Sequence, residues 1–176
     1  AVHQGVAALV EPLAKRALED VCDPAIPGRP VLILDQITDP QNIGALFRSA
    51  AAFGACAVIV QDRRTPPLSG PLAKAAAGAI EMIPCIEVVN IARAINALQE
   101  LGYFCAGLAG EGAEAITTLP GAQPLALVMG AEGSGLRPLV AKHCDGLYRI
   151  PIAEGVESLN VSNAAAISLY EAARNR

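Results

Sequence analysis

Short runs of consecutive apolar residues recur along the chain. The first reads VLILD and covers residues 31–35, and similar runs follow at residues 56–60, 82–88, 103–108, 125–129 and 147–152. Strands that are apolar at every position, rather than at every second one, are typical of parallel sheets buried on both faces. Each run therefore predicts a buried parallel strand.

Helical patterns separate these runs, at residues 44–53, 70–80 and 91–101. Asn90 is suited to cap the third helix at its start, and Gly54 and Gly102 stand where helices commonly end. Strands that alternate with helices predict an α/β fold, a mostly parallel sheet with helices on both faces. Ligands bind such sheets beyond the carboxyl ends of the strands. The loops that follow the first, fifth and sixth runs are therefore the candidate site.

The composition fits one compact domain without a membrane span. The chain has 176 residues, of which 53% are hydrophobic and 17% charged, and no apolar run approaches the roughly 18 residues that a spanning helix needs. Its five cysteines show no CxxC spacing, so we expect a reduced, cytoplasmic protein without a bound metal. Residues 1–30 end in a Pro-rich segment, which predicts a linker that leads into a domain at residues 31–176.

The formal net charge is −4 and the pI is about 5.2. This balance argues against a protein that coats nucleic acid through bulk charge, because such binding depends on neutralising phosphates. A local basic patch stays possible, and the candidate residues for it are Arg63, Arg64, Arg137, Arg149, Arg174 and Arg176.

The loop after the first run contains Asp39-Pro40 and Asn42 where a dinucleotide-binding turn would have GxGxxG. Asn42 is suited to cap the following helix. Arg48 is the only charged residue between Asp39 and Asp62, and its helical stripe carries small neighbours. This arginine is either an ordinary solvated side chain or a group that holds a phosphate or polarises a hydroxyl.

The loop after the fifth run reads GAEGSGLR and covers residues 130–137. Its three glycines bring bare backbone close to a guest. Glu132 stands where a phosphate-binding loop would carry lysine. A carboxylate repels phosphate, so we expect a neutral or cationic ligand, or a catalytic role for Glu132. An exposed Glu in a Gly-rich turn is the alternative.

The last helix begins amid more polar side chains than one cap requires. Ser158, Asn160 and Asn163 alternate with apolar residues there, whereas a helix needs a single Ser or Asn at its N-cap. Ser162 or Asn163 is the candidate cap, and the other polar groups are either redundant caps or groups available for chemistry.

Three segments together resemble the SpoU (TrmH) family of RNA ribose 2′-O-methyltransferases, in the SPOUT superfamily. They are DQITDPQNIGALFRSAAAFG, LALVMGAEGSGLR and IPIAEGVESLNVSNAAAISLYEA, in family order and spacing from about residue 31 to the C-terminus. The upstream HQGVAALVEPL resembles the segment that joins an N-terminal RNA-binding domain to the catalytic domain. The resemblance implies that such a domain precedes this chain, that the C-terminal part forms a trefoil knot, and that the protein is a homodimer. We expect the last helix, with Ile167, Leu169 and Tyr170, to supply packing surface for the dimer.

The resemblance also implies the cofactor and the site residues. S-adenosylmethionine would be held by backbone groups of Gly130, Ile150 and Leu159. Arg48 would be the catalytic arginine, and the residues around it would be Asn42, Glu132, Ser158 and Asn160. Arg174 and Arg176 would help to bind RNA. No metal is implied.

The implied reaction is methylation of a ribose 2′-hydroxyl in structured RNA, with a guanosine of 23S ribosomal RNA as the expected substrate and transfer RNA as the alternative. Two other classes are weighed against it. A non-catalytic RNA-binding or ribosome-assembly factor would have no need of Arg48, Asn42, Glu132 and Asn160, and an oxidoreductase is disfavoured by the missing GxGxxG. Glu157 and Asn163 depart from the family pattern, which affects the expected substrate preference more than the chemistry.

Overall fold

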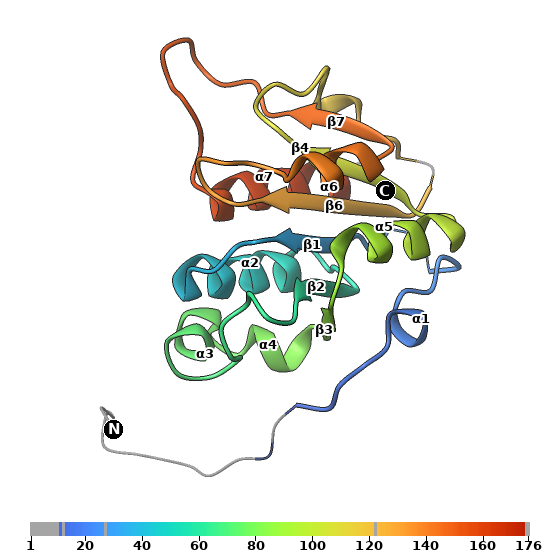
Figure 1. Cartoon of the computed structure of the whole chain (residues 1–176), viewed down its shortest axis with the longest axis vertical. Coiled ribbons are helices and arrows are strands. Elements are labelled where there is room, and N and C mark those ends of the chain that lie inside the picture. The colour runs from blue at the N-terminus through green and yellow to red at the C-terminus, as the bar shows by residue number, and fades with distance from the viewer. Residues whose placement is uncertain (1–10, 12, 27, 122, 175–176) are drawn as a thin grey trace.

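A parallel sheet runs through the middle of the computed structural model, which describes residues 11, 13–26, 28–121 and 123–174 (Figure 1). Its seven strands pair in the order β3-β2-β1-β6-β4-β7-β5, and every pair is parallel. The strands are β1 (Val31–Asp35), β2 (Ala57–Gln61), β3 (Cys85–Val88), β4 (Phe104–Leu108), β5 (Glu114–Ala115), β6 (Leu125–Gly130) and β7 (Gly146–Arg149). The predicted α/β fold is therefore confirmed, and β5 is a strand that the sequence pattern did not predict.

Helices cover both faces of this sheet (Figure 1). One face packs against α2 (Pro40–Ala52), α3 (Gly70–Ala76), α4 (Ala79–Met82) and α7 (Val161–Arg174), with the 3-10 turn η1 (Ile116–Thr118). The other packs against α1 (Leu18–Val21), α5 (Ile91–Glu100) and α6 (Pro138–His143). In β1, Leu32 and Leu34 face the first set of helices, whereas Val31 and Ile33 face the second. This two-sided burial is why the strands are apolar at every position.

Some predicted elements differ from the structure. The pattern at residues 70–80 is two helices, α3 and α4, because the chain turns left-handed at Ala77 (φ 49°) and Gly78 (φ 88°). The run at 82–88 is a strand only from Cys85, and the run at 147–152 ends as a strand at Arg149. As predicted, Gly54 and Gly102 follow the ends of α2 and α5 with positive φ angles, and Asn90 caps the start of α5.

Helix α2 starts earlier than predicted and has a different cap. Its N-cap is Asp39, whose side chain accepts a hydrogen bond from the Gln41 N–H at 3.0 Å, and Pro40 occupies the first helical position. Asn42 is therefore inside the first turn, which frees its side-chain amide for contacts outside the helix.

Helix α7 places its apolar residues on two sides. Leu169 is fully buried against the sheet, whereas Ile167 and Tyr170 are exposed. The expectation that Leu169 supplies external packing surface is therefore wrong, because that side chain belongs to the domain's own core.

The direction of strand order reverses between β1 and β6. These neighbours pair in register from Val31 opposite Ala126 to Asp35 opposite Gly130. The chain leaves β1 toward α2 on one face and leaves β6 toward α6 on the other. Such a reversal opens a crevice at the carboxyl edge of a parallel sheet, which is where ligands bind in this class of fold.

Candidate active site

One oxygen of Glu132 gathers three segments that are distant in the sequence. Its Oε1 accepts hydrogen bonds from Asn160 Nδ2 at 2.7 Å, from Asn42 Nδ2 at 3.0 Å and from the Val161 N–H at 3.4 Å. Asn160 Nδ2 also donates to Asn42 Oδ1 at 2.9 Å. These contacts join three predicted catalytic residues into one polar cluster, which we call the Glu132 cluster. Its members come from the start of α2, the β6–α6 loop and the start of α7.

Asn160 has two roles at once. Its Oδ1 accepts a hydrogen bond from the Ser162 N–H at 2.9 Å, and its carbonyl accepts one from the Ala164 N–H at 3.0 Å. Asn160 is therefore the N-cap of α7, and the expectation that Ser162 or Asn163 caps this helix is wrong. Because the oxygen is used in capping, the amide nitrogen is directed to Glu132 and Asn42.

The glycines of the β6–α6 loop let the loop close on itself. Ala131 and Gly135 form an antiparallel bridge, and Gly133 and Gly135 have φ angles of 77° and 65°. A Cβ on Gly130 would lie 2.2 Å from the Gly135 carbonyl carbon and 2.3 Å from the Leu136 nitrogen. Gly130 is thus required by the loop's own packing, in addition to any contact with a ligand.

A buried ion pair fixes the far end of this loop. Asp35 is fully buried at the end of β1, and its Oδ1 accepts from Arg137 Nε at 2.8 Å and lies 2.6 Å from Arg137 Nη2. Its Oδ2 accepts from the Arg137 backbone N–H at 3.1 Å. Sequence reasoning missed this pair, although a carboxylate at the end of a fully buried strand was a signal, since such a charge needs a partner.

The other predicted site residues lie outside the hydrogen-bonded cluster. Arg48 is exposed on α2, six residues beyond Asn42, and Ser158 is exposed in the extended segment before α7. In the described part of the chain, no hydrogen bond joins either of them to the Glu132 cluster. Ile150 and Leu159 are half-buried.

Several basic residues expected to meet RNA are engaged within the chain. Arg149 Nη1 donates to the carbonyls of Gly112 and Ala113 at 2.6 and 2.8 Å. Arg174 pairs with Glu171 at 2.7 Å on the surface of α7, and Arg137 pairs with Asp35 as above. Arg63 and Arg64 are exposed, whereas Arg176 lies outside the described residues.

Two further features concern metal ions and membranes. The described residues contain no group of three or more His, Cys, Asp or Glu side chains that could hold a metal ion. Among the helices of the described ranges, none has the length and apolarity to cross a membrane.

Comparisons with known proteins agree with the motif resemblance. Residues 29–170 match the family described as the SpoU rRNA Methylase family. A protein of Photobacterium profundum, named 23S rRNA (guanosine-2'-O-)-methyltransferase RlmB, is 46% identical over 179 residues, covering 100% of this chain and 73% of that protein. A protein of Salmonella typhi with the same name is 47% identical over 180 residues, with 100% and 73% coverage.

Solved structures show the same fold. The AdoMet-bound rRNA methyltransferase from Sinorhizobium meliloti superposes with a TM-score of 0.84 at 30% identity, over 92% of this chain and 61% of that one. The SpoU methyltransferase AviRb from Streptomyces viridochromogenes, in complex with AdoMet, gives 0.83 at 26% identity, over 92% and 65%. This chain thus spans under two thirds of each of these structures. Family match, relatives and fold together show that the chain belongs to the SpoU rRNA methylase family.

Proposed function

We propose that this chain catalyses S-adenosylmethionine-dependent methylation of the ribose 2′-hydroxyl of a guanosine in 23S ribosomal RNA. The observation that carries the proposal is the Glu132 cluster, which joins Asn42, Glu132 and Asn160 from all three family motifs at the carboxyl edge of the sheet. The curated relatives that match the whole chain carry this activity in their names.

The residues near the Glu132 cluster fit S-adenosylmethionine. The proposed contacts are backbone groups of Gly130, Ile150 and Leu159. Residues 150–160 contain no helix or strand, so the backbone of Ile150 and Leu159 lies in an irregular segment. Most N–H and C=O groups of that segment lie outside the regular ladders, apart from the Val156 N–H, the Ala153 carbonyl and the Asn160 carbonyl, which have partners within the chain. When bound, the cofactor supplies a methyl group on a positively charged sulfur. A carboxylate at Glu132 is compatible with that charge, whereas it would repel a phosphate.

The protein's part in the reaction is positioning and charge stabilisation. We assign Asn160 and Glu132 to hold the 2′-hydroxyl in line with the methyl group, together with Ser158. Asn42 keeps Glu132 in place through its hydrogen bond at 3.0 Å. Arg48 is assigned to hold the phosphate beside the reacting ribose and to stabilise negative charge that develops on the 2′-oxygen. An arginine stays protonated in proteins, so it is not assigned as the base.

Several properties are proposed from the family resemblance. They are a trefoil knot in the C-terminal part of the sheet, a cytoplasmic homodimer, and an RNA-binding domain joined to the catalytic domain (31–176) through residues 1–30. Exposed Ile167 and Tyr170 on α7 offer apolar surface for a second copy. Arg174 and Arg176 are proposed to contact RNA, and Arg174 would have to exchange its Glu171 partner for a phosphate.

The test of the catalytic assignment is Arg48→Ala. We expect methyl transfer to a 23S ribosomal RNA transcript to be abolished, while calorimetry shows S-adenosylmethionine affinity nearly unchanged, because Arg48 is outside the proposed cofactor contacts. Arg93→Ala is the matched control, since Arg93 is also an exposed helical arginine, on α5. Near-normal turnover by Arg48→Ala would refute the assignment.

The substrate is tested by mapping 2′-O-methylation in RNA from a strain that lacks the gene. Loss of one methyl group from 23S ribosomal RNA is expected. Loss from transfer RNA would favour the alternative substrate, and intact methylation with defective ribosome assembly would favour a non-catalytic factor.

A further inference from the structure

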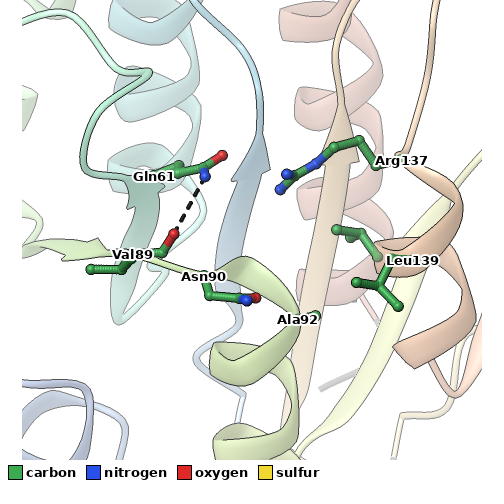
Figure 2. Close-up of a pocket in the computed structure, with 7 residues that line it drawn as sticks. Gln61, Val89, Asn90, Ala92, Arg137 and Leu139 are labelled. Atoms are coloured by element: carbon green, nitrogen blue, oxygen red, sulfur yellow. Dashed lines mark hydrogen bonds between the residues drawn. The ribbon is translucent and has the colours of Figure 1, made fainter.

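Two of the three proposed cofactor contacts lie next to residues that the site already holds in place. Gly130 opens the loop whose far end, Arg137, is paired with the carboxylate at the end of β1, and Figure 2 shows the Arg137 guanidinium beside that end. Leu159 directly precedes the N-cap of α7, which is bound within the Glu132 cluster. The third contact, Ile150, lies outside both arrangements, and its backbone needs a different support.

Ile150 is the first residue beyond the ladder of β7. The last register pair of that strand joins Arg149 to Ala115 of β5. From there to residue 160 the chain forms no helix or strand. The position of the Ile150 backbone therefore depends on how firmly residue 149 is held.

The Arg149 side chain is bonded to backbone rather than to a carboxylate. Its Nη1 donates to the Gly112 carbonyl at 2.6 Å and to the Ala113 carbonyl at 2.8 Å. Among the described residues it forms no ion pair, unlike Arg137 and Arg174. A guanidinium that binds two successive carbonyls neutralises no charge, but its charge-assisted hydrogen bonds join the end of β7 to the chain that carries those carbonyls.

The two carbonyls belong to a turn that follows β4. The Gly112 N–H donates to the Ala109 carbonyl at 3.0 Å, and the Ala109 N–H donates to the Tyr148 carbonyl at 2.9 Å. Gly112 packs so closely on β7 that a Cβ there would lie 2.4 Å from the Tyr148 carbonyl carbon. The turn is thus fixed to β7 by its own backbone, which makes it a firm support for the Arg149 guanidinium.

This turn stands between two proposed cofactor contacts. β4 lies between β6 and β7 in the sheet (Figure 1), and its last residue pairs with β6 on one side and with β7 on the other. Gly130 and the end of β7 are therefore about two strand spacings apart, roughly 10 Å. A cofactor that reaches both Gly130 and Ile150 needs this separation to be constant, and Arg149 ties the end of β7 to the turn in between.

We propose that Arg149 is a positioning residue, which holds the backbone of Ile150 where S-adenosylmethionine binds. The proposal rests on the proposed function, since it concerns the cofactor of that reaction. Because the Arg149 contacts order the start of the segment before the cofactor arrives, they lower the entropy cost of binding. The sequence makes Arg149 a candidate for contact with RNA instead, and the two roles differ in which ligand loses affinity when the guanidinium is removed.

The experiment compares Arg149→Met with the unaltered full-length protein. Methionine keeps the aliphatic part of the side chain but has no N–H to donate to the carbonyls. We expect calorimetry to show S-adenosylmethionine affinity about tenfold weaker, the scale of the charge-assisted hydrogen bonds that are lost. KM for the cofactor should rise by a similar factor, with kcat and KM for RNA changed by less than about twofold, the pattern of lost uniform binding.

Hydrogen exchange measured without cofactor reports the positioning directly. Amides of residues 150–159 should exchange faster in Arg149→Met than in the unaltered protein, because the start of the segment has lost its support. The matched control is Arg93→Met, at an exposed arginine of α5, which should change neither the exchange of this segment nor the affinity for the cofactor.

Circular dichroism at the assay temperature verifies that both variants are folded. Unchanged cofactor affinity in Arg149→Met would overturn the proposal even if Tm falls, because a purely structural contact affects stability alone. Weaker RNA binding by fluorescence anisotropy, with cofactor affinity unchanged, would also overturn it and make Arg149 an RNA contact. Failure of the unaltered protein to bind S-adenosylmethionine would instead overturn the proposed function, and hydrogen exchange would still decide whether Arg149 fixes the segment.

Discussion

Removing Arg137 should destabilise the protein more than removing the charge of Asp35, although the two side chains form one ion pair. Asp35 is fully buried, whereas the Arg137 side chain is 37% exposed. Among the described residues, Arg137→Ala leaves the buried carboxylate with the residue 137 backbone N–H as its single partner. Asp35→Asn leaves a guanidinium that water can reach, and the amide oxygen still accepts one hydrogen bond.

The expected magnitudes follow from this asymmetry. Breaking a buried ion pair by removing one partner costs about 3–5 kcal/mol. We expect about 3–4 kcal/mol for Arg137→Ala, because one backbone donor remains. Asp35→Asn should cost about 1–2 kcal/mol, the scale of a lost charge-assisted hydrogen bond at a partly exposed group. For a domain of this size, about 2–4 °C in Tm corresponds to each kcal/mol, so the losses are about 6–16 °C and about 2–8 °C.

Urea denaturation followed by circular dichroism gives both free energies of unfolding, and thermal scans check the order. Arg93→Ala serves as control, because a surface substitution away from such features usually changes stability by about 0.5 kcal/mol or less. Equal losses in the two variants, or a larger loss in Asp35→Asn, would show that burial of the carboxylate does not govern the energy of this pair.

The structure also predicts how stability responds to a substitution at Gly130 and to a rise in pH. Gly130→Ala should cost at least about 3 kcal/mol, at or above the top of the usual range for overpacking, because its Cβ would meet the backbone of Gly135 and Leu136 within 2.3 Å. Gly110→Ala is the control, since nothing lies within 4 Å of a Cβ added there. A similar small loss of unfolding free energy in both variants, measured by urea denaturation, would contradict this. Stability should also fall as the pH rises from about 9 to about 12. Burial raises the pKa of the Cys85 and Cys144 thiols from 9.0 to about 12, so the unfolded chain releases these protons first and gains stability relative to the folded state. A Cys85→Ala/Cys144→Ala variant should show a weaker decline, and an equal decline would exclude these thiols as its cause.

The sequence was sufficient to predict most of the sheet, because burial on both faces leaves continuous apolar runs such as residues 31–35. It predicted less well where local geometry competes with composition. The run of alanines at 70–80 suggests one helix, but left-handed Ala77 and Gly78 divide it. A propensity argument cannot detect that break, since Ala is the strongest helix former.

The motifs identified the residues of the Glu132 cluster but not their contacts. Asn42 was expected to cap α2, and either Ser162 or Asn163 to cap α7, because short polar residues at helix starts usually do so. Asp39 and Asn160 are the caps instead. The amide nitrogens of Asn42 and Asn160 donate instead to Glu132, which in the case of Asn42 comes from a loop 90 residues further along the chain. No local pattern contains that information.

The β6–α6 loop is held at three points, which explains how a glycine-rich segment can carry precise chemistry. At its start, Gly130, the last residue of β6, pairs with Asp35 in the sheet. At its end, Arg137 binds the carboxylate of that same Asp35. Between them, Glu132 is held by Asn42 and Asn160. Glycines allow the tight path, and the charged side chains fix it. A loop fixed in this way can present backbone to a cofactor and a carboxylate to the reacting ribose with little reorganisation, which is the condition that electrostatic catalysis requires.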